Sequence, residues 1–141
     1  MLGAAQSALV PLATAIYGAL NGTTGFTGLS PIYNDVPQGT PRPYTVLEGF
    51  TEAPWNTMHE YGKTCMFQLH IVSEAEGDQE AFNILSAAIG VLDYSKPAVA
   101  NHKTVQVKYE SLHHWSEEAI AGVKVRHVVG MFRADLAQST S

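Results

Sequence analysis

The sequence predicts an α+β fold in which two helices pack on one face of an antiparallel sheet of about four to five strands. Two segments repeat apolar residues every three or four positions, as amphipathic helices do. Several others alternate apolar and polar residues, as half-buried strands do. These segments follow one another in the order helix, strands, helix, strands. That order favours a sheet with both helices on the same face.

The first helix is expected where an apolar stripe recurs at helical spacing. The stripe consists of Leu9, Leu12, Ala13, Ile16, Tyr17 and Leu20. Pro11 belongs in the first turn, because proline lacks an N–H and clashes in a helix interior. Asn21 and Gly22 end the helix, since both tolerate the left-handed conformation found at helix ends. A flexible Gly/Thr-rich segment is expected from there to about Ser30.

Strands and a stiff loop follow this helix. A short strand is expected at residues 31–34, and a non-helical loop at residues 35–43, where three prolines exclude a central strand. The chain resumes as a strand at residues 44–49. Residues 50–62 are then expected to form a loop or hairpin connection.

A long strand and the second helix occupy the middle of the chain. Residues 63–73 alternate, which places Cys65, Phe67, Leu69 and Ile71 on one face. A helix is expected over residues 78–93, with Asp78 as its N-cap and Glu80 near the positive end of its dipole. Its expected buried stripe consists of Ala81, Phe82, Leu85, Ala88, Ile89 and Leu92.

Two long strands complete the chain, one containing Val105 and the other Val123. Alternation in the second blurs after Val128, which predicts a β-bulge near Gly130. The face of the sheet away from the helices is expected to be polar. It is also expected to include Met66, Val72 and Leu112, apolar positions that suggest contact with a partner.

The bulk properties fit one domain without a membrane segment. We expect a single domain over residues 1–141, in which residues 1–7 and 137–141 are flexible. The apolar run near the N-terminus has no basic residue before it, as a signal peptide would, and is shorter than the roughly 20 residues of a membrane span. Neither export nor a membrane span is therefore expected.

The charge of the chain argues against direct DNA binding. Thirteen acidic residues outnumber eight scattered basic ones, which gives a formal charge of −5. Nucleic-acid binders instead gather basic residues on one face to neutralise phosphates. A mildly acidic surface suits solubility, or the lining of a passage that DNA crosses without sticking.

The cysteine and histidines do not form a recognisable catalytic or metal motif. Cys65 has no neighbouring base and is interpreted as a small buried hydrophobe. The histidines are His59, His70, His102, His113, His114 and His127. Their spacing lacks the close ligand pattern of a zinc site, so they are interpreted as surface or rim residues.

Two other patterns were weighed as possible sites. Residues 61–64 contain the last letters of a phosphate-binding Walker A loop, but Thr57 stands where that loop needs glycine, and a strand follows instead of a helix. The carboxylate pairs Glu74/Glu76 and Glu117/Glu118 lie beside expected turns and are interpreted as solvated. The sequence therefore predicts no catalytic residue, cofactor or metal ligand, and no enzymatic activity.

Residues 33–46 resemble the signature of the phage tail terminator, or tail-completion, family. The matching positions are Val36-Pro37-Gln38-Gly39 and Pro43-Tyr44. In that family an amphipathic helix precedes this loop, and a long alternating strand, a helix and two C-terminal strands follow it. The resemblance covers roughly residues 8–136, and the Gly/Thr stretch at 22–30 departs from it.

The resemblance implies a structural virion protein of a tailed phage or a gene-transfer-agent-like particle, assembled in the host cytoplasm. Such a protein would cap the head-proximal end of the tail tube as a homo-oligomeric, hexameric ring. It would end tube polymerisation and join the tail to the head connector. Its partners would be the tail tube protein and the head–tail connector or adaptor proteins. DNA would only pass through the lumen, and no membrane would be involved.

Subunit or tail-tube contacts are expected from the proline loop and from the C-terminal strand. A stiff loop loses little conformational entropy on binding, although its prolines could equally serve only to shape a turn. The expected contact residues are Val36, Pro37, Gln38, Gly39, Arg42, Tyr44, Lys124, Arg126 and Arg133.

Three other functions stay open from the sequence. The closest is a head-completion or connector adaptor protein of the neck. A small metal-dependent enzyme could use the histidines and Trp115 around a pocket. A small sheet domain could also bind a peptide at its edge.

Overall fold

The computed structural model describes residues 6–56, 61–74, 78–118 and 122–138. Within these ranges the elements are α1 (Leu9–Asn21), α2 (Thr24–Thr27), β1 (Ile32–Tyr33), β2 (Tyr44–Pro54), β3 (Gly62–Ser73), α3 (Gln79–Leu92), β4 (His102–Glu118) and β5 (Lys124–Gln138). The strands form one sheet in the order β1-β2-β3-β5-β4. Neighbouring strands are antiparallel except β1 and β2, which run parallel. The predicted α+β class is confirmed.

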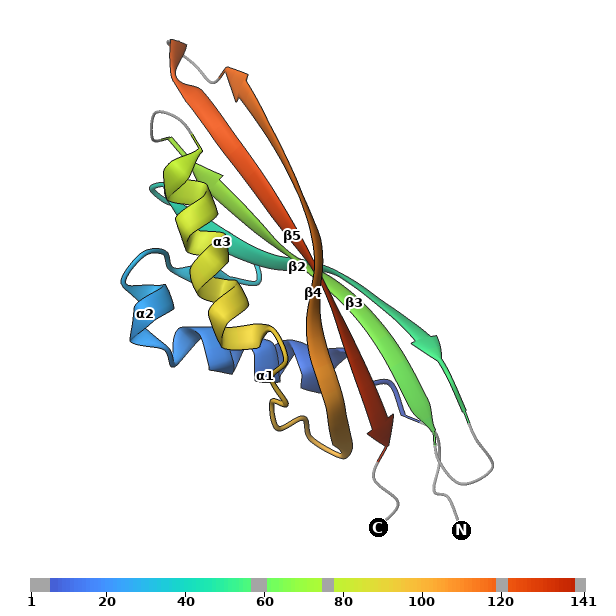
Figure 1. The fold of residues 1–141 in the computed structure, drawn as a ribbon. Helices are drawn as coiled ribbons and strands as arrows, with labels where there is room; N and C mark the ends of the chain where they lie inside the picture. The colour runs from blue at the N-terminus through green and yellow to red at the C-terminus, as the bar shows by residue number, and fades with distance from the viewer. Residues whose placement is uncertain (1–5, 57–60, 75–77, 119–121, 139–141) are drawn as a thin grey trace.

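The helices lie together on one side of a long, strongly twisted sheet (Figure 1). In this layer the axis of α3 runs roughly along the strands, whereas the axis of α1 runs across them. The core between helices and sheet is apolar, and its centre is a row of three aromatic rings on β2, β3 and β5. Phe67 stacks between Phe50 and Phe132, with ring centroids 5.6 and 5.3 Å apart. The rings join three strands that the sequence separates widely.

The alternation predicted for β3 is confirmed. Cys65, Phe67, Leu69 and Ile71 are all buried, while Gln68 and His70 on the opposite face are partly exposed. None of the described helices lies over this opposite face (Figure 1). The structure therefore has one covered and one uncovered face, as antiparallel sheets often do.

The Gly/Thr segment after α1 is not the flexible connection that was expected. It contains the short helix α2, and Phe26 within it is fully buried. The backbone N–H groups of Phe26 and Thr27 both donate to the carbonyl of Thr23. One large aromatic side chain thus fixes a segment whose other residues favour turns.

Strand β2 is longer than expected, because it continues to Pro54 through the residues assigned to a loop. Its register against β3 shifts between Glu48 and Thr51, and Gly49 has a φ of +72° within this bulge. An extra residue resets the alternation of a strand, and here it allows Phe50 to pack on the core. The reset explains why the sequence pattern appeared to end at residue 49.

The bulge predicted near Gly130 is wrong. Pairing between β3 and β5 is continuous through this position, and the register shifts lie in β4, between Thr104 and Gln106 and between Tyr109 and Ser111. Glycine is needed at 130 for packing, since a Cβ there would lie 2.5 Å from Leu85 Cδ1.

The bulge in β4 also changes the face on which Leu112 lies. Leu112 pairs with Gly130, whose Cα faces Leu85 of α3, so it lies on the helix-covered face and not on the uncovered one. Its side chain is still 38% exposed, because this part of β4 extends beside the helix.

Replacing Gly130 with alanine is expected to lower the free energy of unfolding by about 1–3 kcal/mol, because Leu85 must move to admit the new methyl group. Gly90, on an exposed turn of α3, is the matched control, since nothing lies within 4 Å of its added Cβ. Gly90→Ala should stabilise the protein by up to about 1 kcal/mol, as alanine favours helices. Urea unfolding of both variants measures the difference, and equal effects would contradict this packing role.

The buried side of α3 differs from the predicted stripe, in which Ile89 is only partly buried. Ile84 is fully buried, whereas Phe82 is 36% exposed and meets His114 of β4 edge to face. Asp78 occupies the N-cap position but its side chain makes no capping hydrogen bond. Its carboxylate lies instead 3.6 Å from the guanidinium of Arg126.

The two ends of the described chain meet. The backbone N–H of Gln6 donates to the Gln138 side chain at 2.9 Å, and Ala137 and Gln138, expected at the start of a flexible tail, are buried residues of β5. Nearby, the Glu52 carboxylate accepts hydrogen bonds from the Ala8 N–H and the Ser7 hydroxyl. A carboxylate there stabilises the positive end of α1.

Candidate functional site

Both edges of the sheet offer backbone groups to another chain. On one edge, the segment after α3 covers β4 only locally, through hydrogen bonds of Val107 with Tyr94 and Ser95. On the other edge, β1 pairs with β2 only at Thr45 and Val46. Among the described residues, no strand pairs with the outer side of residues 110–118 or of the rest of β2. Free edges of this length are templates for pairing with another chain.

The β4–β5 hairpin projects beyond α3 and the end of β3 (Figure 1). Three large apolar side chains on it are exposed by 38 to 44%: Leu112, Trp115 and Val123. Leu112 and Trp115 lie level with β3 on opposite faces of the sheet, and Val123 lies near the tip, so they are separate exposed apolar residues along this edge and do not form one patch.

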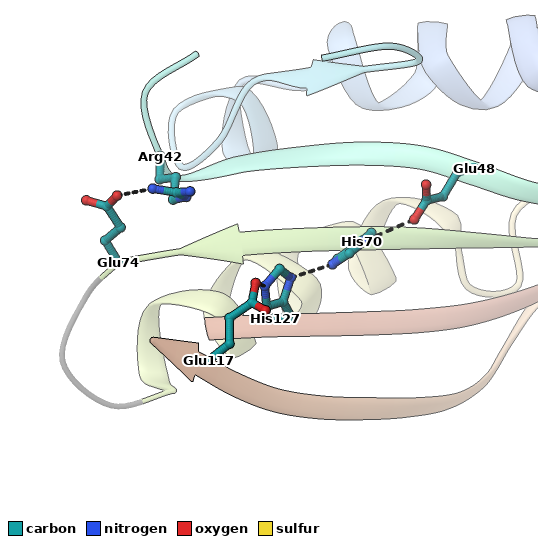
Figure 2. A network of polar contacts seen from close by, with 6 residues as sticks. All are labelled: Arg42, Glu48, His70, Glu74, Glu117 and His127. Atoms are coloured by element: carbon teal, nitrogen blue, oxygen red, sulfur yellow. Dashed lines mark hydrogen bonds and ion pairs between the residues drawn. The ribbon is translucent and has the colours of Figure 1, made fainter. Parts of the chain in front are cut away.

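A row of four polar side chains crosses the uncovered face at the base of this arm (Figure 2). Glu48 Oε1 lies 3.0 Å from His70 Nδ1, His70 Nε2 lies 2.7 Å from His127 Nδ1, and His127 Nε2 lies 2.7 Å from Glu117 Oε1. The four residues come from β2, β3, β5 and β4. The row therefore connects the four long strands.

Burial decreases from the centre of the row to its ends. The side chains of His127 and His70 are 12 and 22% exposed, against 39% for Glu48 and 60% for Glu117. The Trp115 ring stacks on the imidazole of His127, with centroids 4.8 Å apart and planes 6° apart. The two imidazoles are thus shielded, while both carboxylates reach water.

The row was not predicted from the sequence because each of its contacts joins diagonal neighbours on adjacent strands. His70 lies directly opposite Val129, and His127 opposite Val72, so the two rings meet across one diagonal of the ladder. Diagonal neighbours in a sheet are within reach of long side chains, but their identity depends on strand register. The only signal in the sequence was a histidine at an outward position of β3.

The proline loop contains a tight turn and is joined to the sheet at its end. The Thr40 N–H donates to the Pro37 carbonyl at 3.2 Å, with Gly39 between them at a φ of +82°. This geometry requires a residue that tolerates positive φ at the third position of the turn. An ion pair between Arg42 and Glu74 then joins the loop to the end of β3 (Figure 2).

The basic residues expected to form contacts on β5 are partly engaged within the chain. Arg126 pairs with Asp78, and Arg133 lies 3.1 Å from Asp135. Lys124 is exposed near the tip of the hairpin.

The structure brings some of these predicted contact residues together and separates another. Register places Tyr44 beside Val72, and Val72 beside His127, so the end of the proline loop and the start of β5 share one end of the sheet. Arg133 lies seven residues further along β5 and belongs to a different region.

Neither the cysteine nor the other described side chains form a reactive centre. Burial raises the pKa of the Cys65 thiol to about 11, so the thiol is protonated and a poor nucleophile at neutral pH. Among the described residues no group of three or more His, Cys, Asp or Glu side chains could hold a metal ion. His59 lies outside the described residues. None of the described helices is long and apolar enough to cross a membrane.

A comparison with models of protein families identifies the family of this chain. The model of the family described as Tail completion protein gp17 matches residues 14–134. The chain belongs to this family. A tail completion protein is a non-enzymatic structural component of the virion, so the predicted family, virion location and lack of enzymatic activity are confirmed. The metal-dependent enzyme considered from the sequence is excluded.

The fold of this tail completion protein also occurs in a solved particle. A chain in the structure described as "Virion of native gene transfer agent (GTA) particle" superposes with a TM-score of 0.81 and 15% sequence identity. The match covers 94% of this chain and 99% of that one. No curated protein matches the sequence significantly. The identity is too low to compare residues at the sites, so this match concerns the fold.

Proposed function

We propose that this tail completion protein assembles as a ring, six-fold in symmetry, on the head-proximal end of the tail tube. There it ends tube polymerisation and forms the joint between the tail and the head connector. Its partners are further copies of itself, the tail tube protein and the connector or adaptor proteins. The particle is a tailed phage or a gene-transfer-agent-like particle, whose DNA passes through the ring.

The main support for this proposal is that the single sheet has two free edges. A contact that joins two different surfaces of identical chains forms a ring when successive rotations close. The outer side of β4 over residues 110–118 and the free part of β2 are two such surfaces, at opposite ends of the strand order. Pairing β4 of one copy with β2 of the next would continue the sheet around the ring, and would bury Leu112 and Trp115 beside the seam.

The net charge supports passage of DNA through the ring. Each chain carries a formal charge of −5, so six copies would carry about −30, which repels phosphate from the lumen. Arg126 and Arg133 do not oppose this, because both are paired with carboxylates in the same chain.

The proline loop is the second contact region that we propose, with residues 36–39, Arg42 and Tyr44. Its turn and the Arg42–Glu74 ion pair hold it at the end of the sheet where Lys124 begins β5. A surface held in this way is ordered before binding, which lowers the entropic cost of contact with the tail tube. Arg133, in the other region of β5, would contact a neighbouring subunit.

Electron microscopy of particles made with and without this gene tests the function. Tubes of abnormal length together with heads that lack joined tails are the expected result of deletion. Tubes of normal length beside unjoined heads would favour the runner-up, an adaptor protein of the neck. Normal particles with joined tails would refute both.

A further inference from the structure

We propose that Glu48, His70, His127 and Glu117 form a pH-dependent clip. The clip links the tip of the β4–β5 hairpin, residues 117–118 and 124–125, to β3 and β2 through side chains while the two imidazoles share three ring protons. It opens when a fourth proton binds. The device belongs to a single chain, so it stands whether or not the chain forms a ring.

The proton count follows from the three contacts. The two imidazoles have four ring nitrogens, of which two face carboxylate oxygens and two face each other. A carboxylate only accepts hydrogen bonds, so His70 Nδ1 and His127 Nε2 must each carry a proton. The contact between the rings needs one proton more, because a hydrogen bond joins one donor to one acceptor. Three protons on two imidazoles place one positive charge between two carboxylates.

Any other proton count breaks a contact. With four protons, an N–H group of His70 faces an N–H group of His127 across 2.7 Å, and two positive rings lie 5.0 Å apart. With two protons, one of the three contacts has no hydrogen between its two atoms. Two lone pairs then face each other, and a partly buried acceptor has no donor. Histidine is the side chain that most readily gains a proton on mild acidification, so acidification would bring the fourth proton.

The surroundings favour the singly charged, closed state. The face of Trp115 lies against His127, and an aromatic face attracts a cation. The neutral side chain of Gln68 is 3.4 Å from Glu48 and adds no charge. Among the described residues no other charged group contacts the two rings.

The nearest other charges are already paired. Arg42 is paired with Glu74 to one side of the row, at the end of β3, as Figure 2 shows. Arg126, next to His127 in the chain, is paired with Asp78 of α3. The carboxylates of Glu48 and Glu117 are therefore the charges that set the protonation of the clip.

Opening of the clip would affect the hairpin most. Beyond Tyr109, β4 pairs by its backbone with β5 alone among the described strands, and His114 adds side-chain contacts with Phe82 and Asp78. The His127–Glu117 and Trp115–His127 contacts are the side-chain links from this part of β4 to the row. Pairing of β5 with β3 ends at Arg126, so residues 117–118 and 124–125 form a two-stranded ribbon, which without these links is only marginally stable.

An NMR titration of the histidine rings on the full chain tests the clip. His70 and His127 should titrate together in two resolved steps, because strongly coupled groups release their protons as a pair. His113, which is exposed on β4, is the control ring. At the acidic step, amide exchange at residues 117–118 and 124–125, corrected for its intrinsic pH dependence, should become about tenfold faster.

Two carboxylate variants separate the clip from a merely structural contact. Glu117→Gln removes a negative charge from the row and should move both steps to lower pH, because protonation is then less favourable. Glu118→Gln removes the adjacent charge on the opposite side of the strand and should leave both steps in place. The proposal would be overturned if His70 and His127 titrated independently in single steps that Glu117→Gln did not move. That result would leave the proposed role in joining tails to heads untouched, because electron microscopy of particles tests that role separately.

Discussion

Replacing Phe67 with alanine is expected to lower the free energy of unfolding by about 3–5 kcal/mol. The ring is fully buried and stacks between Phe50 of β2 and Phe132 of β5, so its removal opens a cavity where three strands and the helix layer meet. Two aromatic stacking contacts are lost together with the buried apolar area. Urea unfolding followed by circular dichroism measures the change.

The matched control is Phe82→Ala, which removes the same group from a position 36% exposed on α3. Its expected cost is about 1 kcal/mol or less, as is usual for side chains outside the core. Similar costs for the two variants would contradict the assignment of the aromatic row as the centre of the core.

A proline in the free part of β4 is expected to abolish the joining of tails to heads. Successive amides of a strand point to opposite sides. Of the two variants Leu112→Pro and His113→Pro, one therefore removes an amide that faces β5, and the other removes an amide that faces away from the sheet. The first should cost about 3 kcal/mol of stability or more. The second should leave the fold intact but block pairing with another copy.

Each variant is expressed in place of the natural gene, and heads with joined tails are counted by electron microscopy. The variant that unfolds normally in urea should give as few joined tails as the deletion. Wild-type numbers from that variant would remove the β4 edge from the proposed interface. The loop variant Pro37→Ala/Gly39→Ala, measured in the same way, tests the second contact region independently, and normal tails there would remove the loop.

The elements that depend on local sequence were predicted well. The helical periods at residues 9–20 and 78–93 and the alternation at residues 63–73 agree with α1, α3 and β3. The turn at Pro37–Thr40 also follows from its residues, since Gly39 adopts the positive φ that such a turn requires. These features depend on residues within one or two turns of each other, and so the sequence alone determines them.

The errors arose where one inserted residue or one buried side chain changed the pattern. Bulges in β2 and β4 shifted the alternation, which hid the second half of β2 and moved Leu112 to the helix-covered face. Phe26 turned an apparently flexible segment into a short helix against the core. Gly130 was interpreted as the mark of a bulge, whereas its role is to leave room for Leu85.

The fold class, the order of the elements and the family could be predicted from the sequence, because they depend on periodicity and on a short turn motif. Which side chains meet across the strands depends on the tertiary structure. His70 and His127 are 57 residues apart and become neighbours through the register of β3 with β5. Register is set by the packing of the whole sheet against its helices, so no local pattern could place Glu48, His70, His127 and Glu117 in one row.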